Sequence, residues 1–297
     1  MSDAGAAPAV AALPRGLDPA RAARARWRRT VTPVAIIGAA LVGIVVAVAL
    51  SAPVLAPHPP AAQIAKPLLP PGATHLLGTD EFGRDELSRL IWGARVSLYV
   101  GGLAVLIALG LGATAGVIAG FFGGWVDDIV MRIMDVVLSL PALVLAIAIT
   151  SVLGPTLTNA MLAIGLVYAP TFARVARGPT LTVVQVPFIE AARSIGASSW
   201  RIIARHVLPN VMAPILVQMT VSFSTAILTE AALSFLGLGT QPPTASWGLM
   251  LSAARQYMLI DPWIAVLPGS AIALTVLGFN LLGDGLRDLL DPRMRTL

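Results

Sequence analysis

The chain contains no cysteine, a single lysine and only three histidines among its 297 residues. The absence of cysteine excludes disulfides, thiolate metal sites and cysteine nucleophiles. The lysine, Lys66, lies between Ala65 and Pro67, so it cannot end a Gly-rich phosphate loop, in which Ser or Thr follows the lysine. We therefore do not expect this chain to bind ATP through such a loop.

The chain also lacks the residue spacings of a metal site. His58, His75 and His206 are far apart in sequence, and none belongs to a His-Glu-x-x-His pattern. The basic residues are not clustered with stacking aromatics, which argues against a nucleic-acid partner. We predict no catalytic residue, no metal and no cofactor bound to this chain.

Charge is scarce as well, because only 12% of the residues are charged while 57% are hydrophobic. Soluble domains have about 25% charged and roughly 45–50% apolar residues, so the composition indicates a membrane protein. Uncharged runs long enough to cross about 30 Å of hydrocarbon occupy residues 30–57, 96–126, 136–173, 207–229 and 262–283. Gly154 and Pro155 divide the longest run into two spans. The sequence predicts an all-α fold with six transmembrane helices.

The distribution of basic residues predicts the orientation of these helices. With the N-terminus inside, 15 of the 20 Lys and Arg residues lie on the inner side, which is the bias of cytoplasmic flanks. Both termini are therefore expected in the cytoplasm. The predicted organisation is a cytoplasmic tail, a first transmembrane helix, an extracytoplasmic segment, a core with helices two to six and a second cytoplasmic tail, at residues 1–30, 31–57, 58–95, 96–286 and 287–297. The arginines of the first tail are expected to hold it near anionic lipid.

Glycines in the second span recur every four residues, at Gly112, Gly116, Gly120 and Gly124. This spacing places them on one helix face and lets another backbone approach closely. We predict a helix-packing seam, with chance in a glycine-rich chain as the alternative.

The polar segment 185–210 carries the most information in the chain. Pro187 precedes a short helical stretch, Gly196 ends it, and Ser198 or Ser199 is placed to cap a second stretch. The second stretch is amphipathic, with apolar residues on one face and two arginines on another: Trp200, Ile203 and Val207 against Arg201 and Arg205. On these residues alone, an interfacial helix lying on anionic lipid is an equal alternative.

The residues Glu190-Ala191-Ala192, Gly196 and Leu208-Pro209 resemble the EAA loop of permease subunits in bacterial ABC importers. This resemblance implies that the segment forms coupling helices, which dock into a cytoplasmic ATPase subunit. The six residues named are then the candidate sites of coupling.

Three further segments narrow the resemblance: 77–98, 227–248 and 281–293 are similar to the C-type permeases of dipeptide, oligopeptide, nickel and glutathione importers. The resemblance implies a type I importer permease fold in the bacterial inner membrane. It also implies four partners: a homologous B-type permease forming a heterodimer, two ATPase subunits that bind ATP and Mg²⁺, and an extracytoplasmic peptide-binding protein.

Two groups of charges lie outside these motifs. Asp80, Glu81, Arg84, Asp85, Glu86 and Arg89 precede the second span, and they form a lid held by ion pairs, a contact for a delivering protein or a plain solvated helix start. At the start of the third span, Arg132 is spaced to pair with Asp135 or Asp128.

Glu230, near the outer end of the fifth span, has either a structural hydrogen-bonding role or a part in the gate or substrate path. An acidic residue within a transmembrane helix faces protein or water.

We therefore predict the permease subunit of an ATP-driven importer for dipeptides or oligopeptides that hydrolyses nothing itself. Import of nickel, glutathione or another small solute by the same architecture is the first alternative. An ion-coupled secondary transporter is the second, but such proteins carry ionisable residues deep in the bundle, and only Glu230 approaches that pattern.

Overall fold

The computed structural model describes residues 32–290. The tail 1–30 and most of the tail 287–297 lie outside the described residues. The described part is helical, and its helices are α2 (Pro33–Leu50), α3 (Ala52–Leu55), α4 (Glu86–Phe122), α5 (Gly124–Leu138), α6 (Ala142–Leu153), α7 (Leu157–Val184), α8 (Pro187–Ser194), α9 (Ser199–Ile202), a π-helical turn (Ile203–Val207), α10 (Leu208–Phe235), α11 (Trp247–Ala254) and α12 (Trp263–Leu290).

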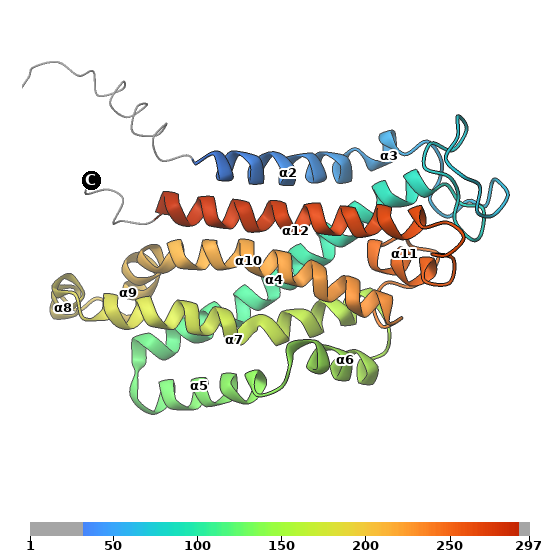
Figure 1. Cartoon of the computed structure of the whole chain (residues 1–297). Helices are drawn as coiled ribbons and strands as arrows, with labels where there is room; N and C mark the ends of the chain where they lie inside the picture. Colours follow the sequence, from blue (N-terminus) through green and yellow to red (C-terminus); the bar gives the residue numbers. More distant parts are fainter. Residues whose placement is uncertain (1–31, 291–297) are drawn as a thin grey trace, which may run out of the picture.

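The long helices lie side by side in a bundle with two distinct ends (Figure 1). The short helices α8 and α9 lie at one end, which we call the α8 end, together with the start of α2 and the last turn of α12. The opposite end, which we call the α11 end, carries α3, α11 and the long connection 56–85. The polar segment 185–210 and the connection 56–85, which contains the start of the motif 77–98, therefore lie at opposite ends of the bundle.

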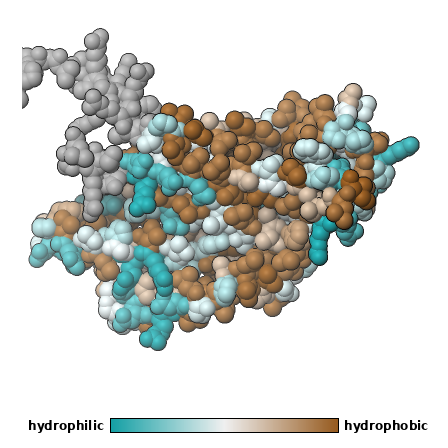
Figure 2. Space-filling model, in the orientation of Figure 1, coloured by the Kyte–Doolittle hydropathy of each residue, from teal (hydrophilic) through white to brown (hydrophobic). Residues whose placement is uncertain are grey.

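Five helices are long and apolar enough to cross a membrane, and a sixth span results if α5 and α6 count as one. These two helices are bent by 87° where the chain passes through Pro141, whose missing N–H and ring disfavour a continuous helix. Figure 2 shows apolar side chains around the middle of the bundle and hydrophilic ones gathered toward its ends. The chain is a multi-pass membrane protein.

Three of the transmembrane helices begin earlier than predicted, because charged residues used as boundaries lie inside the helices. The second span begins at Glu86 instead of residue 96, and the third begins at Gly124 instead of residue 136. The fifth begins at Ser199 instead of residue 207, because α9, the π turn and α10 follow one another without a break. The predicted division at Gly154 is correct, since α6 ends at Leu153 and α7 starts at Leu157.

α4 lies at the centre of the bundle. Its contact with α7 is the most extensive contact between any two helices of the described residues. A Cβ atom added at Gly112 would meet the carbonyl oxygen of Ala169, and one at Gly116 that of Ala173. At Gly120 the added atom would lie 2.9 Å from the Cβ of Thr180. The predicted fourth member, Gly124, is not part of this contact: it starts α5 with a φ of +53°, and a Cβ there would meet nothing within 4 Å.

Candidate functional site

The loop between α7 and α10 begins with α8, whose first residue is Pro187. Proline is favoured there because its fixed φ suits a helix and its missing N–H is not needed in the first turn. Glu190 lies in the same first turn, where a carboxylate is stabilised by the positive end of the helix dipole. Pro187 and Glu190 therefore both favour the start of α8, each through a local effect.

Gly196 ends α8 with a φ of +79°, a conformation that L side chains rarely adopt. The N–H of Ala197 donates to the carbonyl of Ala192 at 3.1 Å, and the N–H of Gly196 donates to that of Arg193 at 2.9 Å. These two bonds form the glycine-dependent helix end known as the Schellman motif. A Cβ on Gly196 would meet no atom within 4 Å, so the backbone conformation, not space, requires glycine here.

Buried aliphatic side chains fix this loop to the bundle. Ile189, Ala192 and Ile202 pack in the main hydrophobic cluster together with Val207. The guanidinium of Arg193 lies over the ring of Phe121, 5.4 Å from its centroid, at the end of α4. The loop is therefore attached to both α4 and the start of α10.

The outward side of the loop is apolar at its tip. Ile195 is 86% exposed and Trp200 is 64% exposed, next to the bend at Gly196. Of the six candidate coupling residues, Ala192 is buried, whereas Glu190, Ala191, Gly196, Leu208 and Pro209 are exposed. The loop thus presents a surface that nothing in residues 32–290 covers.

The second half of the loop differs from its prediction in two respects. Ser198 occupies the N-cap position of α9, but its side chain makes no capping hydrogen bond. The predicted amphipathic helix is four residues of α-helix followed by a π-helical turn, in which Ile203 and Val207 are buried while Arg205 is exposed. Trp200 does not join the buried face, so the predicted apolar stripe is incomplete.

Two ion pairs link α5 to α7 near the α8 end. Asp127 accepts two hydrogen bonds from the guanidinium of Arg177, and Asp135 accepts one from Arg174 at 2.6 Å. The predicted pairing of Arg132 with Asp135 or Asp128 does not occur, and Asp135 pairs with Arg174 of α7 instead. None of the α5 residues is buried.

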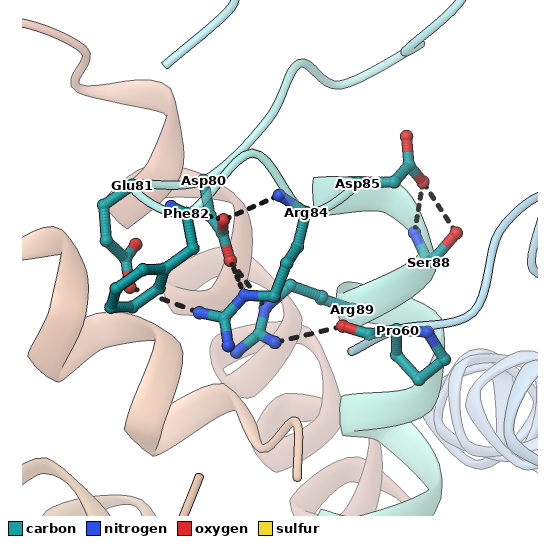
Figure 3. Close-up of polar contacts among 8 residues, drawn as sticks. All are labelled: Pro60, Asp80, Glu81, Phe82, Arg84, Asp85, Ser88 and Arg89. Atoms are coloured by element: carbon teal, nitrogen blue, oxygen red, sulfur yellow. Dashed lines mark hydrogen bonds and ion pairs between the residues drawn. The ribbon is translucent and has the colours of Figure 1, made fainter. Parts of the chain in front are cut away.

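The charged residues from Asp80 to Arg89 gather around the start of α4 at the α11 end, and Figure 3 shows all of them except Glu86. Asp80 accepts from the side chain of Arg84 and lies 3.2 Å from the Nε of Arg89, while its other oxygen accepts from the backbone N–H groups of Phe82 and Arg84, both at 2.9 Å. Arg89 also donates to the carbonyl of Pro60 at 3.1 Å.

Burial overturns the interpretation of these charges as a solvated helix start. Asp80, Arg84, Asp85, Glu86 and Arg89 are all less than 9% exposed. Glu81 is half-buried and lies 3.2 Å from Arg84; burial raises the pKa of its carboxyl above the usual value. Buried charges need partners, and Arg84 and Arg89 both pair with Asp80, so these residues form a structural network that folds the connection 56–85 onto α4.

Glu230 is completely buried near the α11 end of α10. Its carboxylate accepts from Ser234 at 2.7 Å, from Thr240 at 3.2 Å and from Ser97 of α4 at 3.4 Å. These bonds join α10, α4 and the chain leading to α11. Of the two roles considered for Glu230, the geometry supports the structural one.

The same end holds a group that sequence spacing did not reveal. His58 and His75 both lie beside Asp85, and one potential ligand atom from each of the three residues lies within 4.8 Å of the others. The three residues come from separate points of the connection 56–85, so no local pattern in the sequence could have signalled their meeting.

The arrangement of the bundle resembles that of a solved membrane transporter. A chain of the solved inward-facing MetNI methionine ABC transporter superposes with a TM-score of 0.55, and the match covers 68% of this chain and 96% of that chain at 19% identity. Identity this low establishes similarity of fold only.

Sequence similarity gives the family. The model of the binding-protein-dependent transport system inner membrane component matches residues 112–296. The dipeptide transport system permease protein DppC of Alkalihalophilus pseudofirmus is 51% identical over 76% of this chain and 74% of its own length. The probable D,D-dipeptide transport system permease protein DdpC of Escherichia coli is 44% identical over 90% of each chain. The glutathione transport system permease protein GsiD of Pectobacterium atrosepticum is 47% identical over 76% of this chain and 75% of its own length.

The chain belongs to the family of binding-protein-dependent transport system inner membrane components. It is a permease subunit of an ABC importer, and this assignment replaces the alternative of an ion-coupled secondary transporter.

Proposed function

We propose that this chain imports dipeptides and oligopeptides as one of two permease subunits, driven by ATP hydrolysis in partner subunits. The relatives named above carry dipeptides, D,D-dipeptides and glutathione by name, and all three cargoes are small peptides. The shared chemistry of these cargoes supports the peptide class over nickel.

The observation that carries the coupling role is the exposed apolar tip of the loop between α7 and α10. Ile195 and Trp200 project from a bend that Ile189 and Ile202 fix firmly to the bundle. Such a patch fits a groove on another protein, and its anchorage would transmit a push to α10 and α4. We assign the partner as an ATPase subunit, which binds ATP and Mg²⁺, because this chain has no phosphate-binding loop.

We propose that the second permease packs against α5. This helix buries none of its residues in the chain, and Asp128, Arg132 and Asp135 line an open hollow of about 780 Å³ along it. A polar hollow on a membrane helix is costly to leave against lipid, which favours another protein or a water-filled path over it. We place the homologous B-type permease here, with the substrate path between the two subunits.

These assignments fix the orientation. The α8 end faces the cytoplasm and the α11 end faces the peptide-binding protein outside. Both chain ends are then cytoplasmic, because α2 starts and α12 finishes at the α8 end (Figure 1). The close packing of α4 on α7 makes the bundle move as a rigid body, so ATP-driven movement of the loop switches access from one side to the other.

The test replaces Gly196 by leucine, which opposes the left-handed backbone at the bend. In proteoliposomes with the complete importer, we expect Gly196→Leu to insert normally and to lose peptide uptake, with ATP hydrolysis that no longer responds to peptide. Gly43→Leu is the matched control, because Gly43 of α2 has the same open space and no positive φ.

A second variant probes the surface instead of the backbone. Ile195→Asp places a charge on the proposed docking tip, and we expect about 2 kcal/mol weaker assembly with the ATPase, roughly 30-fold in Kd. Ile64→Asp makes the same change at the α11 end and is expected to leave assembly unchanged. Normal uptake and peptide-stimulated hydrolysis in Gly196→Leu, with unchanged assembly of Ile195→Asp, would refute the coupling role.

A further inference from the structure

The α11 end brings together two imidazoles and one carboxylate from a connection that has little secondary structure. His58 follows α3, His75 lies midway along the connection and Asp85 is the N-cap of α4. The Nδ1 of His75 lies 2.9 Å from the Oδ1 of Asp85, and the Nδ1 of His58 lies 3.8 Å from the same oxygen. The two rings are 5.2 Å apart between centroids.

Ser88 holds this group from behind. The other carboxylate oxygen of Asp85 accepts from the N–H of Ser88 at 2.8 Å and from its hydroxyl at 2.7 Å. The backbone N–H of His58 donates to the same hydroxyl at 3.1 Å. Asp85 and His58 are thus positioned by one residue of α4, and the Oδ1 of Asp85 lies beside the Nδ1 atoms of both imidazoles.

Hydrogen bonding within the chain does not satisfy all three groups. The Nδ1 of His58 is inaccessible to solvent and has no hydrogen-bond partner, although its side chain is 33% exposed overall. Folded proteins seldom bury a polar atom without a partner, because the lost hydrogen bonds to water are then not replaced. A cation between the three groups would give this nitrogen a partner.

The donor set has a definite chemistry. Two imidazole nitrogens and one carboxylate oxygen are ligands of Zn²⁺ and related transition metals, whereas Mg²⁺ and Ca²⁺ prefer oxygen alone. Zn²⁺ binds such atoms at about 2.0–2.2 Å, which places tetrahedral ligands about 3.3 Å apart. The observed 2.9 and 3.8 Å bracket that spacing.

We propose that His58, His75 and Asp85 form a binding site for a divalent transition metal of the zinc class. The ion ties α3, the middle of the connection 56–85 and the start of α4 to one another. It stabilises the α11 end and takes no part in moving the substrate. The proposal goes beyond the function proposed above, since it does not depend on the cargo or on coupling.

The chain offers clean conditions for a test. It has no cysteine to bind zinc elsewhere, and its third histidine, His206, lies at the α8 end within the π turn. The full-length chain is purified in its importer complex through an affinity tag without histidine. Zn²⁺ bound per complex is measured by mass spectrometry after equilibrium dialysis, and its affinity by competition with a coloured chelator.

The variants are His58→Asn and His75→Asn, with His206→Asn as the matched control. Asparagine places an amide nitrogen near the position of the Nδ1 of histidine, so His75→Asn keeps a donor for Asp85 and preserves the fold. We expect the wild type and His206→Asn to hold one more Zn²⁺ per copy of this chain than the other two variants. The loss of affinity should exceed the roughly 10–100-fold typical of removing an outer-shell partner.

A second measurement separates metal binding from misfolding. Zn²⁺ should raise the unfolding temperature of the wild type and of His206→Asn, and it should leave that of His58→Asn and His75→Asn unchanged. Equal zinc content and affinity in all four proteins would overturn the proposal, as would a wild type that binds no zinc at this end. Peptide uptake is not part of the readout, so the outcome is independent of the proposed function.

Discussion

The two ends of the bundle use the same kind of interaction in opposite environments. At the α11 end, Arg89 pairs with Asp80, and their side chains are 3% and 5% exposed. Between α5 and α7, Arg174 and Asp135 pair at 57% and 59% exposure in this chain alone. Buried pairs enforce one geometry because breaking them leaves a charge without water, whereas exposed pairs exchange readily with solvent. The α11 end is therefore fixed within the chain, while the α8 end is left adaptable.

The difference does not extend to exposed apolar groups. Both ends leave large ones uncovered: Leu76 of the connection 56–85 is 62% exposed, and Ile195 of the loop between α7 and α10 is 86% exposed. The polar contacts do differ, since α4 binds the connection through bonds such as that from Arg89 to the carbonyl of Pro60. Buried polar contacts, not the exposure of apolar side chains, therefore distinguish the two ends.

The largest expected effect is that of removing a buried charge at the α11 end. Arg89→Ala leaves Asp80 short of one partner, and we expect about 3–5 kcal/mol less stability. Thermal unfolding of the purified importer measures the change. Arg255→Ala, an exposed arginine at the same end, should shift stability by no more than about 0.5 kcal/mol. Equal unfolding temperatures for the two variants would contradict the structural role of the cluster.

Glu230 distinguishes a structural group from a gate. Glu230→Ala removes the acceptor of three hydroxyl groups and leaves a cavity, so we expect a loss of about 2–4 kcal/mol. Glu230→Gln keeps the shape and one oxygen, and the hydroxyls can reorient, so stability and peptide uptake should both remain near normal. Uptake abolished in a stable Glu230→Gln protein would instead show that the charge belongs to the gate or path.

The contact of α4 with α7 joins the two ends, and its tightness decides whether they move together. Gly116→Leu would drive a side chain into the backbone of Ala173, and we expect a cost of about 1–3 kcal/mol from overpacking. Gly110→Leu is the matched control in the same helix, because its Cβ would meet nothing within 4 Å. The contact would not be rigid if both variants unfolded at the same temperature.

Sequence patterns predict the spans well but not their ends. Long uncharged runs and Gly154 are sufficient to place the apolar helices, since a membrane imposes length and polarity directly. Using charged residues as boundaries is wrong at Glu86, which is buried in the first turn of α4, and in α5, where partners on α7 allow charges inside the helix. The partners Arg174 and Arg177 lie on another helix, and no spacing rule within α5 reveals them.

The candidate sites divide in the same way. The bend at Gly196 is predictable, because a local backbone conformation needs glycine and leaves a local signal. The meeting of His58, His75 and Asp85 is not, because it depends on how an irregular connection folds back on α4. Burial of the charges from Asp80 to Arg89 escapes prediction for the same reason, since a hydrophilic sequence indicates exposure until its partners are known.

The smallest effect is expected for the coupling energy of the exposed ion pair between Arg174 and Asp135. The buried pair between Arg89 and Asp80 provides the comparison. A double-mutant cycle on Arg174 and Asp135 should give about 0.2–1 kcal/mol, as for other exposed pairs. Raising the salt from about 0.1 to 1 M shortens the Debye length from about 10 to 3 Å and should remove most of this coupling. The cycle on Arg89 and Asp80 should give a larger energy that salt hardly changes, because solvent ions do not reach the pair. Equal salt dependence of the two cycles would mean that water reaches the α11 cluster, and the contrast between a fixed end and an adaptable end would fail.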